Sequence, residues 1–193
     1  MNEKEIIIKA QNGDVNAFEM LVEKHQNNIY KTAFSMVQNH HDATDIAQIA
    51  LIKVYHNLSK FNFKSSFSAW LYRITVNSCL DEIRKRKRTN DSTITINDEE
   101  NPLEIESDML TPEASYEKKE LKKLVWQKIG LLSDKYKKVI ILRDINGLSY
   151  EEIADVENCS VGTVKSRINR ARQSLKEILL KDGTFSLWVS SYR

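Results

Sequence analysis

The chain has 193 residues, an apolar fraction of 41% and a net charge of only +2 at neutral pH. This length allows one large domain or two small ones, and the apolar content is sufficient for well-packed cores. No apolar run approaches membrane-spanning length, which excludes stable membrane insertion. With no signal peptide, the distant Cys79 and Cys159 are expected to stay reduced, so we expect a cytoplasmic protein.

Helical patterns fill the first half of the chain. Apolar residues recur there at spacings of three and four, the period of a helix with one buried face. The patterned ranges are about 3–12, 15–38, 43–58 and 67–87. Gly13-Asp14 and residues 39–42 interrupt them, and no segment shows the sustained alternation of a strand. The sequence therefore predicts an all-α fold.

The third pattern begins with acidic residues. Asp42 opens it, at a position where a carboxylate commonly stabilises the helix dipole. Asp45 and Gln48 lie on the outward face, where a carboxylate and an amide suit a basic coiled-coil partner. His40 and His41 precede them, but adjacent histidines project in different directions and no further ligand cluster supports a metal site.

An aromatic and polar loop leads into the fourth pattern. Trp70, Leu71 and Ile74 are expected in the core, whereas the loop itself has the hydroxyl, amide and aromatic groups that can hold an unstacked base. The helix continues into a basic run, which suits phosphates. The candidate residues for contact with DNA are Phe61, Lys64, Ser65, Ser66, Asn77, Arg84, Lys85 and Arg86.

An acidic segment follows and divides the chain. It contains both prolines, Pro102 and Pro112, and apolar periodicity lapses within it, so we expect a flexible linker. The predicted divisions are a helical domain 1–90, the linker 91–112, a smaller helical domain 113–182 and a tail 183–193.

The second domain contains the pattern of a helix-turn-helix. Ser149 and Glu152 form a capping box, Asn158 suits the turn, and Ser160 can cap the next helix. That helix carries an apolar stripe on one side and polar groups on the other, which suits the major groove of DNA. Its candidate reading residues are Thr163, Lys165, Ser166, Arg167, Asn169 and Arg170.

Catalysis is not predicted. The five glycines are scattered and form no phosphate-binding loop, and no nucleophile or general-base constellation is visible. We therefore expect a protein that is not an enzyme and uses no cofactor or metal.

Four blocks together resemble bacterial RNA polymerase sigma factors of the extracytoplasmic function (ECF) group. They occur in the expected order and the resemblance covers about residues 5–180. The blocks are Asp42-Ala43-x-Asp45-Ile46-x-Gln48, Phe67-x-x-Trp70-Leu71-Tyr72-Arg73-Ile74-x-x-Asn77-x-x-x-Asp81, Leu148-Ser149-Tyr150-Glu151-Glu152-Ile153-Ala154 and Gly162-Thr163-Val164-Lys165-Ser166-Arg167. Ile49 stands where the group commonly has Glu, and Leu51 where it commonly has Phe.

The resemblance implies a function and partners. Such a subunit binds core RNA polymerase through the β′ clamp helices and the β flap, and directs it to promoter DNA. The candidate residues for contact with polymerase are Asp42, Asp45 and Gln48, of which Asp45 and Gln48 match the clamp-binding surface by position. Phe61–Ser66 with Asn77 match the part that captures a base of the −10 element. Lys165, Ser166, Asn169 and Arg170 match the −35 reading helix. An anti-sigma factor is a further partner in many members of the group.

Two other classes compete with this reading. An autonomous helix-turn-helix regulator that binds a palindrome as a dimer would account for the motif in the second half of the chain, but it assigns no function to residues 61–88. A small hydrolase built on His40, His41 and Asp45 lacks the remaining catalytic groups. Co-purification with core polymerase separates the sigma factor from both.

Overall fold

The computed structural model describes residues 2–88 and 123–181, and every regular element in these two ranges is helical. The predicted all-α fold is confirmed. The predicted linker 91–112 and tail 183–193 lie outside the described residues.

The first half contains four α-helices and one short 3₁₀ turn. They are α1 (Glu3–Gln11), α2 (Val15–Val37), α3 (His40–Asn57), η1 (Leu58–Lys60) and α4 (Phe67–Arg88). Side-chain caps explain where they begin. The side chain of Asn2 accepts the Lys4 N–H, and that of Asp14 accepts the Ala17 N–H at 3.1 Å.

The start of α3 differs from the sequence-based expectation of an interruption over 39–42. The helix begins at His40, because the Asn39 side chain caps it by accepting the Asp42 N–H at 2.9 Å. The preceding helix ends at Val37, and its C-cap Gln38 adopts a left-handed conformation with φ of 56°. The interruption between α2 and α3 is thus a two-residue turn.

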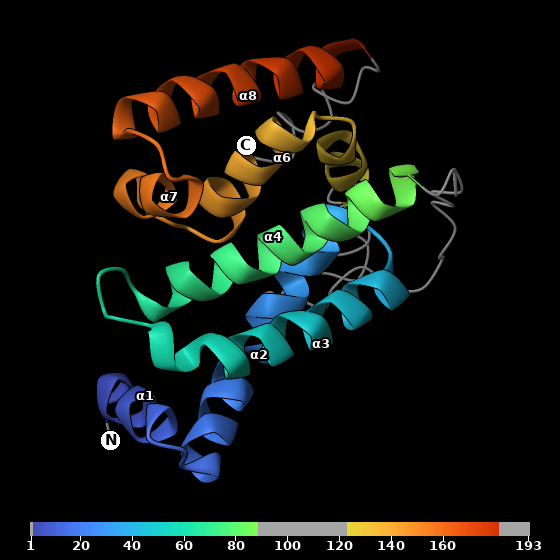
Figure 1. Ribbon diagram of the computed structural model, residues 1–193. Coiled ribbons are helices and arrows are strands. Elements are labelled where there is room, and N and C mark those ends of the chain that lie inside the picture. Colours follow the sequence, from blue (N-terminus) through green and yellow to red (C-terminus); the bar gives the residue numbers. More distant parts are fainter. Residues whose placement is uncertain (1, 89–122, 182–193) are drawn as a thin grey trace, which may run out of the picture.

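The helices of the first half enclose an apolar core. α2 packs on both α3 and α4, and α1 lies across the end of α2 (Figure 1). Residues from all four helices and η1 meet in one buried cluster, among them Ile7, Leu21, Ile29, Ala50, Val54, Leu58, Phe61, Phe67 and Trp70. Burial of this apolar surface is the main stabilising contribution to this half.

The second half begins with a helical segment at 123–130. It continues through α6 (Asp134–Ile140), the π-helical segment η2 (Ile141–Ile145), α7 (Tyr150–Glu157) and α8 (Val161–Lys181). The capping box predicted for α7 is present: Ser149 Oγ accepts the Glu152 N–H at 3.1 Å, and Glu152 Oε2 accepts the Ser149 N–H at 2.9 Å. Asn158 ends α7 with φ of 50°.

The two halves pack against each other. One buried cluster includes Ala33 and Val76 from the first half, and Ile140 and Leu142 from the second. Asn146 Nδ2 donates to Thr32 Oγ1 at 3.1 Å across the boundary. Figure 1 shows α6 and α7 above α4, with α8 across the top of the molecule.

Gly130 permits a close approach at this boundary. A Cβ atom there would meet the Gln38 side chain at 2.7 Å, closer than real Cβ atoms come to their neighbours. The same Gln38 side chain donates from Nε2 to the carbonyl of Trp126. The end of α2 is therefore fitted to the helical segment 123–130.

Candidate nucleic-acid interface

The helix-turn-helix presents a polar face on α8. Val164, Ile168 and Ala171 are buried, as the predicted apolar stripe requires. Ser160 Oγ accepts the Thr163 N–H at 3.2 Å, so the predicted cap is also present. Five of the predicted reading residues are exposed together on the opposite face: Thr163, Lys165, Ser166, Asn169 and Arg170.

Arg167 does not share that face. Only 15% of its side chain is exposed, and its Nη1 donates to Glu157 Oε2 at the end of α7. The other oxygen of Glu157 lies 2.5 Å from Lys138 Nζ on α6. Glu157 therefore links three helices, and Arg167 positions α8 within its own domain.

The ring of Tyr150 contacts two cations, one of them on the reading face. The Arg143 guanidinium is 4.8 Å from the centre of the Tyr150 ring, and Lys165 Nζ is 5.8 Å from it. Arg143 also donates to the Leu148 carbonyl at 2.6 Å. Tyr150 thus contacts Lys165, a contact that the sequence pattern did not indicate because Tyr150 lies on the other helix of the motif.

The loop between η1 and α4 divides its aromatic residues between core and surface. Phe61 is only 5% exposed, and its ring centre lies 5.4 Å from that of Phe67 and 5.3 Å from that of Trp70. Phe61 therefore supports the loop from beneath. Phe63, which the sequence analysis did not single out, is 39% exposed, and Lys64 beside it is exposed as well.

Ser66 joins this loop to the helix-turn-helix. Its Oγ accepts the Ala69 N–H at 3.2 Å at the start of α4, and donates to Glu152 Oε1 at 2.6 Å. Burial raises the pKa of Glu152, but the hydrogen bonds from Ser66 and Ser149 outweigh it, so the pKa lies below its ordinary value. Ser65 is half-buried.

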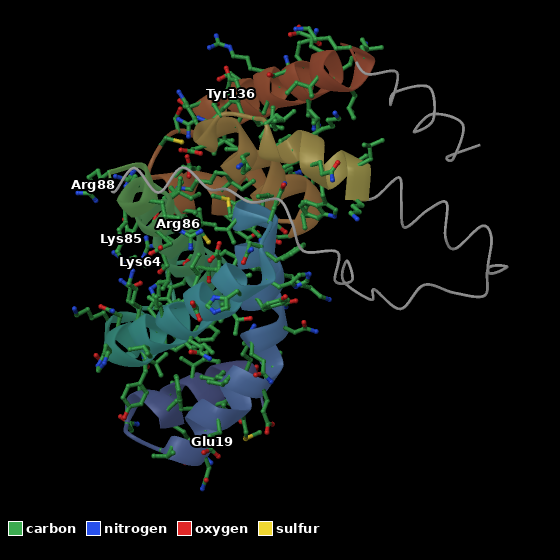
Figure 2. All side chains as sticks on the ribbon, turned by 90° about the vertical axis from the view of Figure 1, so that its right-hand side faces the viewer. Glu19, Lys64, Lys85, Arg86, Arg88 and Tyr136 are labelled. Carbon is green, nitrogen blue, oxygen red and sulfur yellow. The ribbon has the colours of Figure 1, made fainter. Side chains whose placement is uncertain are left out.

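α4 carries polar and basic groups outward along its length. Asn77, Arg84 and Lys85 are exposed. Figure 2 shows Lys64, Lys85, Arg86 and Arg88 toward one side of the molecule, while Figure 1 places the loop and the last turn of α4 at opposite ends of that helix. The basic groups are therefore spread over a distance of about 30 Å, the length of a 22-residue helix.

Arg86 joins two of the predicted surfaces. Its Nη1 and Nη2 donate to the two carboxylate oxygens of Asp42 at 2.5 Å each, and its Nε donates to Glu82 at 3.2 Å. The hydrogen bonds that Arg86 donates to Asp42, with a smaller contribution from the bond to Glu82, raise the pKa of Arg86. The sequence analysis assigned Asp42 to polymerase and Arg86 to DNA, but their side chains bind each other.

The outward face of α3 forms one further surface. Asp45 and Gln48 are exposed, and Asp45 lies 3.2 Å from His41 Nδ1. Ile49 and Ile52 continue the same stripe and are also exposed. The sequence-based placement of this face outside the core is correct for Asp45 and Gln48, while Asp42 is half-buried beside Arg86.

The described residues are helical in every regular element, with a capped helix-turn-helix and a second, basic helical surface, which is the architecture of a DNA-binding transcription protein. Among the described residues, no helix is both long and apolar enough to cross a membrane. Nor do the histidines, cysteines and carboxylates of residues 2–88 and 123–181 gather into a group able to hold a metal ion.

Comparisons with known proteins identify the family. The profile of Sigma-70 region 2 matches residues 21–89, and that of Sigma-70 region 4 matches residues 122–175. The chain is 38% identical to the ECF RNA polymerase sigma factor SigW of Bacillus subtilis, covering 91% of this chain and 96% of that protein. It is 37% identical to the RNA polymerase sigma-H factor of Pseudomonas aeruginosa, covering 92% and 93%.

A solved structure agrees with these relatives. The sigma factor RpoE of Bartonella quintana, solved with the anti-sigma factor NepR, matches with a TM-score of 0.64 and 29% identity. The match covers 86% of this chain and 98% of that one. The chain belongs to the ECF group of the sigma-70 family of RNA polymerase sigma factors.

Proposed function

We propose that this sigma factor divides promoter recognition between its two helical halves, with its polymerase contact on α3. As a sigma factor it binds core RNA polymerase, directs promoter-specific initiation and is not an enzyme. The observation that carries the proposed division is the presence of exposed polar side chains on three surfaces built by different helices: the α3 face, the α4 loop and helix, and the α8 face.

The second half is proposed to read the −35 element. Exposed hydroxyl, amide and guanidinium groups on α8 can reach base edges in the major groove. The proposed contacts are Thr163, Lys165, Ser166, Asn169 and Arg170. Arg167 acts through Glu157, because its guanidinium is already bound there. The β flap is the proposed polymerase contact of this half.

The first half is proposed to hold the opened −10 element. Lys64, Ser65 and Ser66 lie in the loop, and Asn77 lies on the exposed side of α4. Arg84 and Lys85 are placed to meet phosphates, whereas Arg86 is held by Asp42. Since Ser66 is bound to Glu152, the loop must release this bond before the serine hydroxyl can meet DNA.

Binding to the β′ clamp helices is assigned to Asp45 and Gln48, with Asp42 fixing the start of α3. The test is reconstitution with core polymerase, measured as the affinity of the labelled chain for core enzyme. Asp45→Ala combined with Gln48→Ala should weaken binding, because both side chains are exposed and neither supports the core. Glu19→Ala is the matched control, an exposed carboxylate on α2 at the far end of the molecule (Figure 2). Equal affinities for the double variant and the control would refute the assignment.

Two further proposals follow from the family. The site of action is the cytoplasm, where core polymerase and promoter DNA are found. An anti-sigma factor is a proposed regulatory partner, supported by the similarity to the Bartonella quintana sigma factor that was solved with one. A purified anti-sigma factor should displace the labelled chain from core polymerase. A protein that binds the holoenzyme without displacing the labelled chain is not its anti-sigma factor.

A further inference from the structure

The exposed aromatic ring of the −10 loop belongs to Phe63. Phe61 and Phe67 are 5% and 4% exposed and lie in the core, whereas Phe63 is 39% exposed. The Phe63 ring centre lies 4.9 Å from that of Phe61, with the planes inclined by 58°. Phe63 therefore rests with one side on a buried aromatic layer and presents the rest of its ring outward.

The backbone at Phe63 adopts a conformation that bulky residues avoid. Its φ is +59°, in the left-handed region that favours glycine, and among the described non-glycine residues only Gln38 and Asn158 share a positive φ. Each of those two residues ends a helix, which is a common reason for this conformation. Phe63 ends no helix, and residues held in such a conformation cluster at ligand-binding sites.

Two contacts hold the ring in this position. Asn62 Oδ1 accepts the Lys64 N–H at 3.3 Å, so an Asx turn encloses Phe63 and fixes its direction. Lys4 Nζ from α1 lies 5.6 Å from the centre of the ring, within cation–π range. The ring is thus oriented before any ligand arrives, with exposed Lys4 over it and exposed Lys64 next to it in the chain.

We propose that Phe63 is the stacking platform for an unpaired base of the −10 element. This inference rests on the proposed function, since it requires that the loop receives single-stranded DNA. Every base has a π-face, so an exposed ring stacks bases with little sequence preference, and nearby cations bind the backbone. Phe61, the aromatic residue that the sequence favoured for contact with DNA, is the support beneath the platform rather than the platform itself.

The test uses holoenzyme and a fluorescent single-stranded DNA of about 12 nucleotides, selected beforehand by binding to the wild-type holoenzyme. Phe63→Leu keeps an apolar side chain but removes the π-face, and Phe63→Gly removes the ring and suits the positive φ. Both should weaken binding of the strand roughly 5- to 150-fold, the loss expected for one stacked base. Phe63→Tyr should bind within about two-fold of wild type, because it keeps the stacking face.

Thermal unfolding separates stacking from folding. Phe63→Gly should unfold at a temperature close to that of wild type, because relief of the left-handed backbone offsets the packing that is lost with a partly exposed ring. Phe61→Ala should unfold at a clearly lower temperature, because it empties a buried site. A Phe63→Gly variant that loses as much stability as Phe61→Ala would assign the ring a structural role in the core and overturn the proposal.

Asn77→Ala distinguishes this inference from the proposed function. If Asn77→Ala weakens strand binding while Phe63→Leu and Phe63→Gly bind as wild type, the stacking platform is refuted and the −10 assignment stands. If none of these variants changes strand binding, the −10 assignment of the loop fails together with the platform.

Discussion

Removal of the Glu157 carboxylate should be among the most destabilising single changes in the second half. The Glu157 side chain is 8% exposed and lies between Lys138 and Arg167, which are themselves mostly buried. Glu157→Ala leaves two cations close together with no anion, and removal of one partner of a buried ion pair costs about 3–5 kcal/mol. For a chain of this size that corresponds to a fall in Tm of roughly 6–20 °C.

Asp144→Ala is the matched control. Asp144 also accepts from an arginine, Arg172, but that pair is at the surface and the Arg172 side chain is 51% exposed. Such a pair contributes about 0–1 kcal/mol, because water and salt screen it. Both variants are compared by urea unfolding followed by far-UV circular dichroism, at low and at high salt.

A triple replacement identifies the cause of the loss. Lys138→Met, Glu157→Leu and Arg167→Met together remove all three charges and keep similar volume. The triple variant should recover most of the stability lost by Glu157→Ala, because apolar replacement of a buried ionic group is often neutral or stabilising. A loss for Glu157→Ala no larger than that for Asp144→Ala refutes the argument that an unpaired buried charge governs this site.

Three further predictions concern the promoter, the polymerase contact and acid. Arg170→Ala should cost about 1–3 kcal/mol on the cognate −35 duplex and little on scrambled DNA, measured with holoenzyme; equal losses would mean that α8 does not read sequence. Arg86→Ala should weaken binding to core polymerase as Asp42→Ala does, and the double variant should lose no more than either single one; additive losses would mean that Arg86 and Asp42 act independently. Arg84→Ala should instead reduce the salt dependence of DNA binding by about one unit. Because the pKa of Glu152 is lowered in the folded chain, its contribution to stability is complete above the ordinary value of 4.5 and is lost as the pH falls through the lowered value. Ser66→Ala should reduce this loss of stability in acid, and an unchanged profile of stability against pH would show that the Ser66 bond does not stabilise the carboxylate.

Local patterns in the sequence predicted local structure well. The capping box of Ser149 and Glu152, the left-handed Asn158 and the buried stripe through Val164 and Ile168 are all present. Each depends on residues a few positions apart, so spacing and side-chain chemistry determine it. The function was predicted from the ordered set of family motifs, because no single motif is specific enough to indicate it.

Contacts between distant parts of the chain were beyond the sequence patterns. Arg86 is charged and lies in a basic run, which is typical of a phosphate contact, yet Asp42, 44 positions away, binds it. Phe61 and Phe63 are the same residue type two positions apart, and only the packing of Phe67 and Trp70 determines which one is buried. Both results depend on tertiary packing, which overrides local preference.

The capture of Arg167 by Glu157 has a consequence for how promoter preference can evolve. With Arg167 engaged inside the domain, the exposed reading face has cations at Lys165 and Arg170, and its other proposed contacts, Thr163, Ser166 and Asn169, are uncharged. Substitutions among the uncharged positions exchange hydrogen bonds to bases without altering the attraction to phosphates. A protein encoded by a duplicate of this gene can therefore acquire a new set of promoters while it keeps its sequence-independent affinity for DNA.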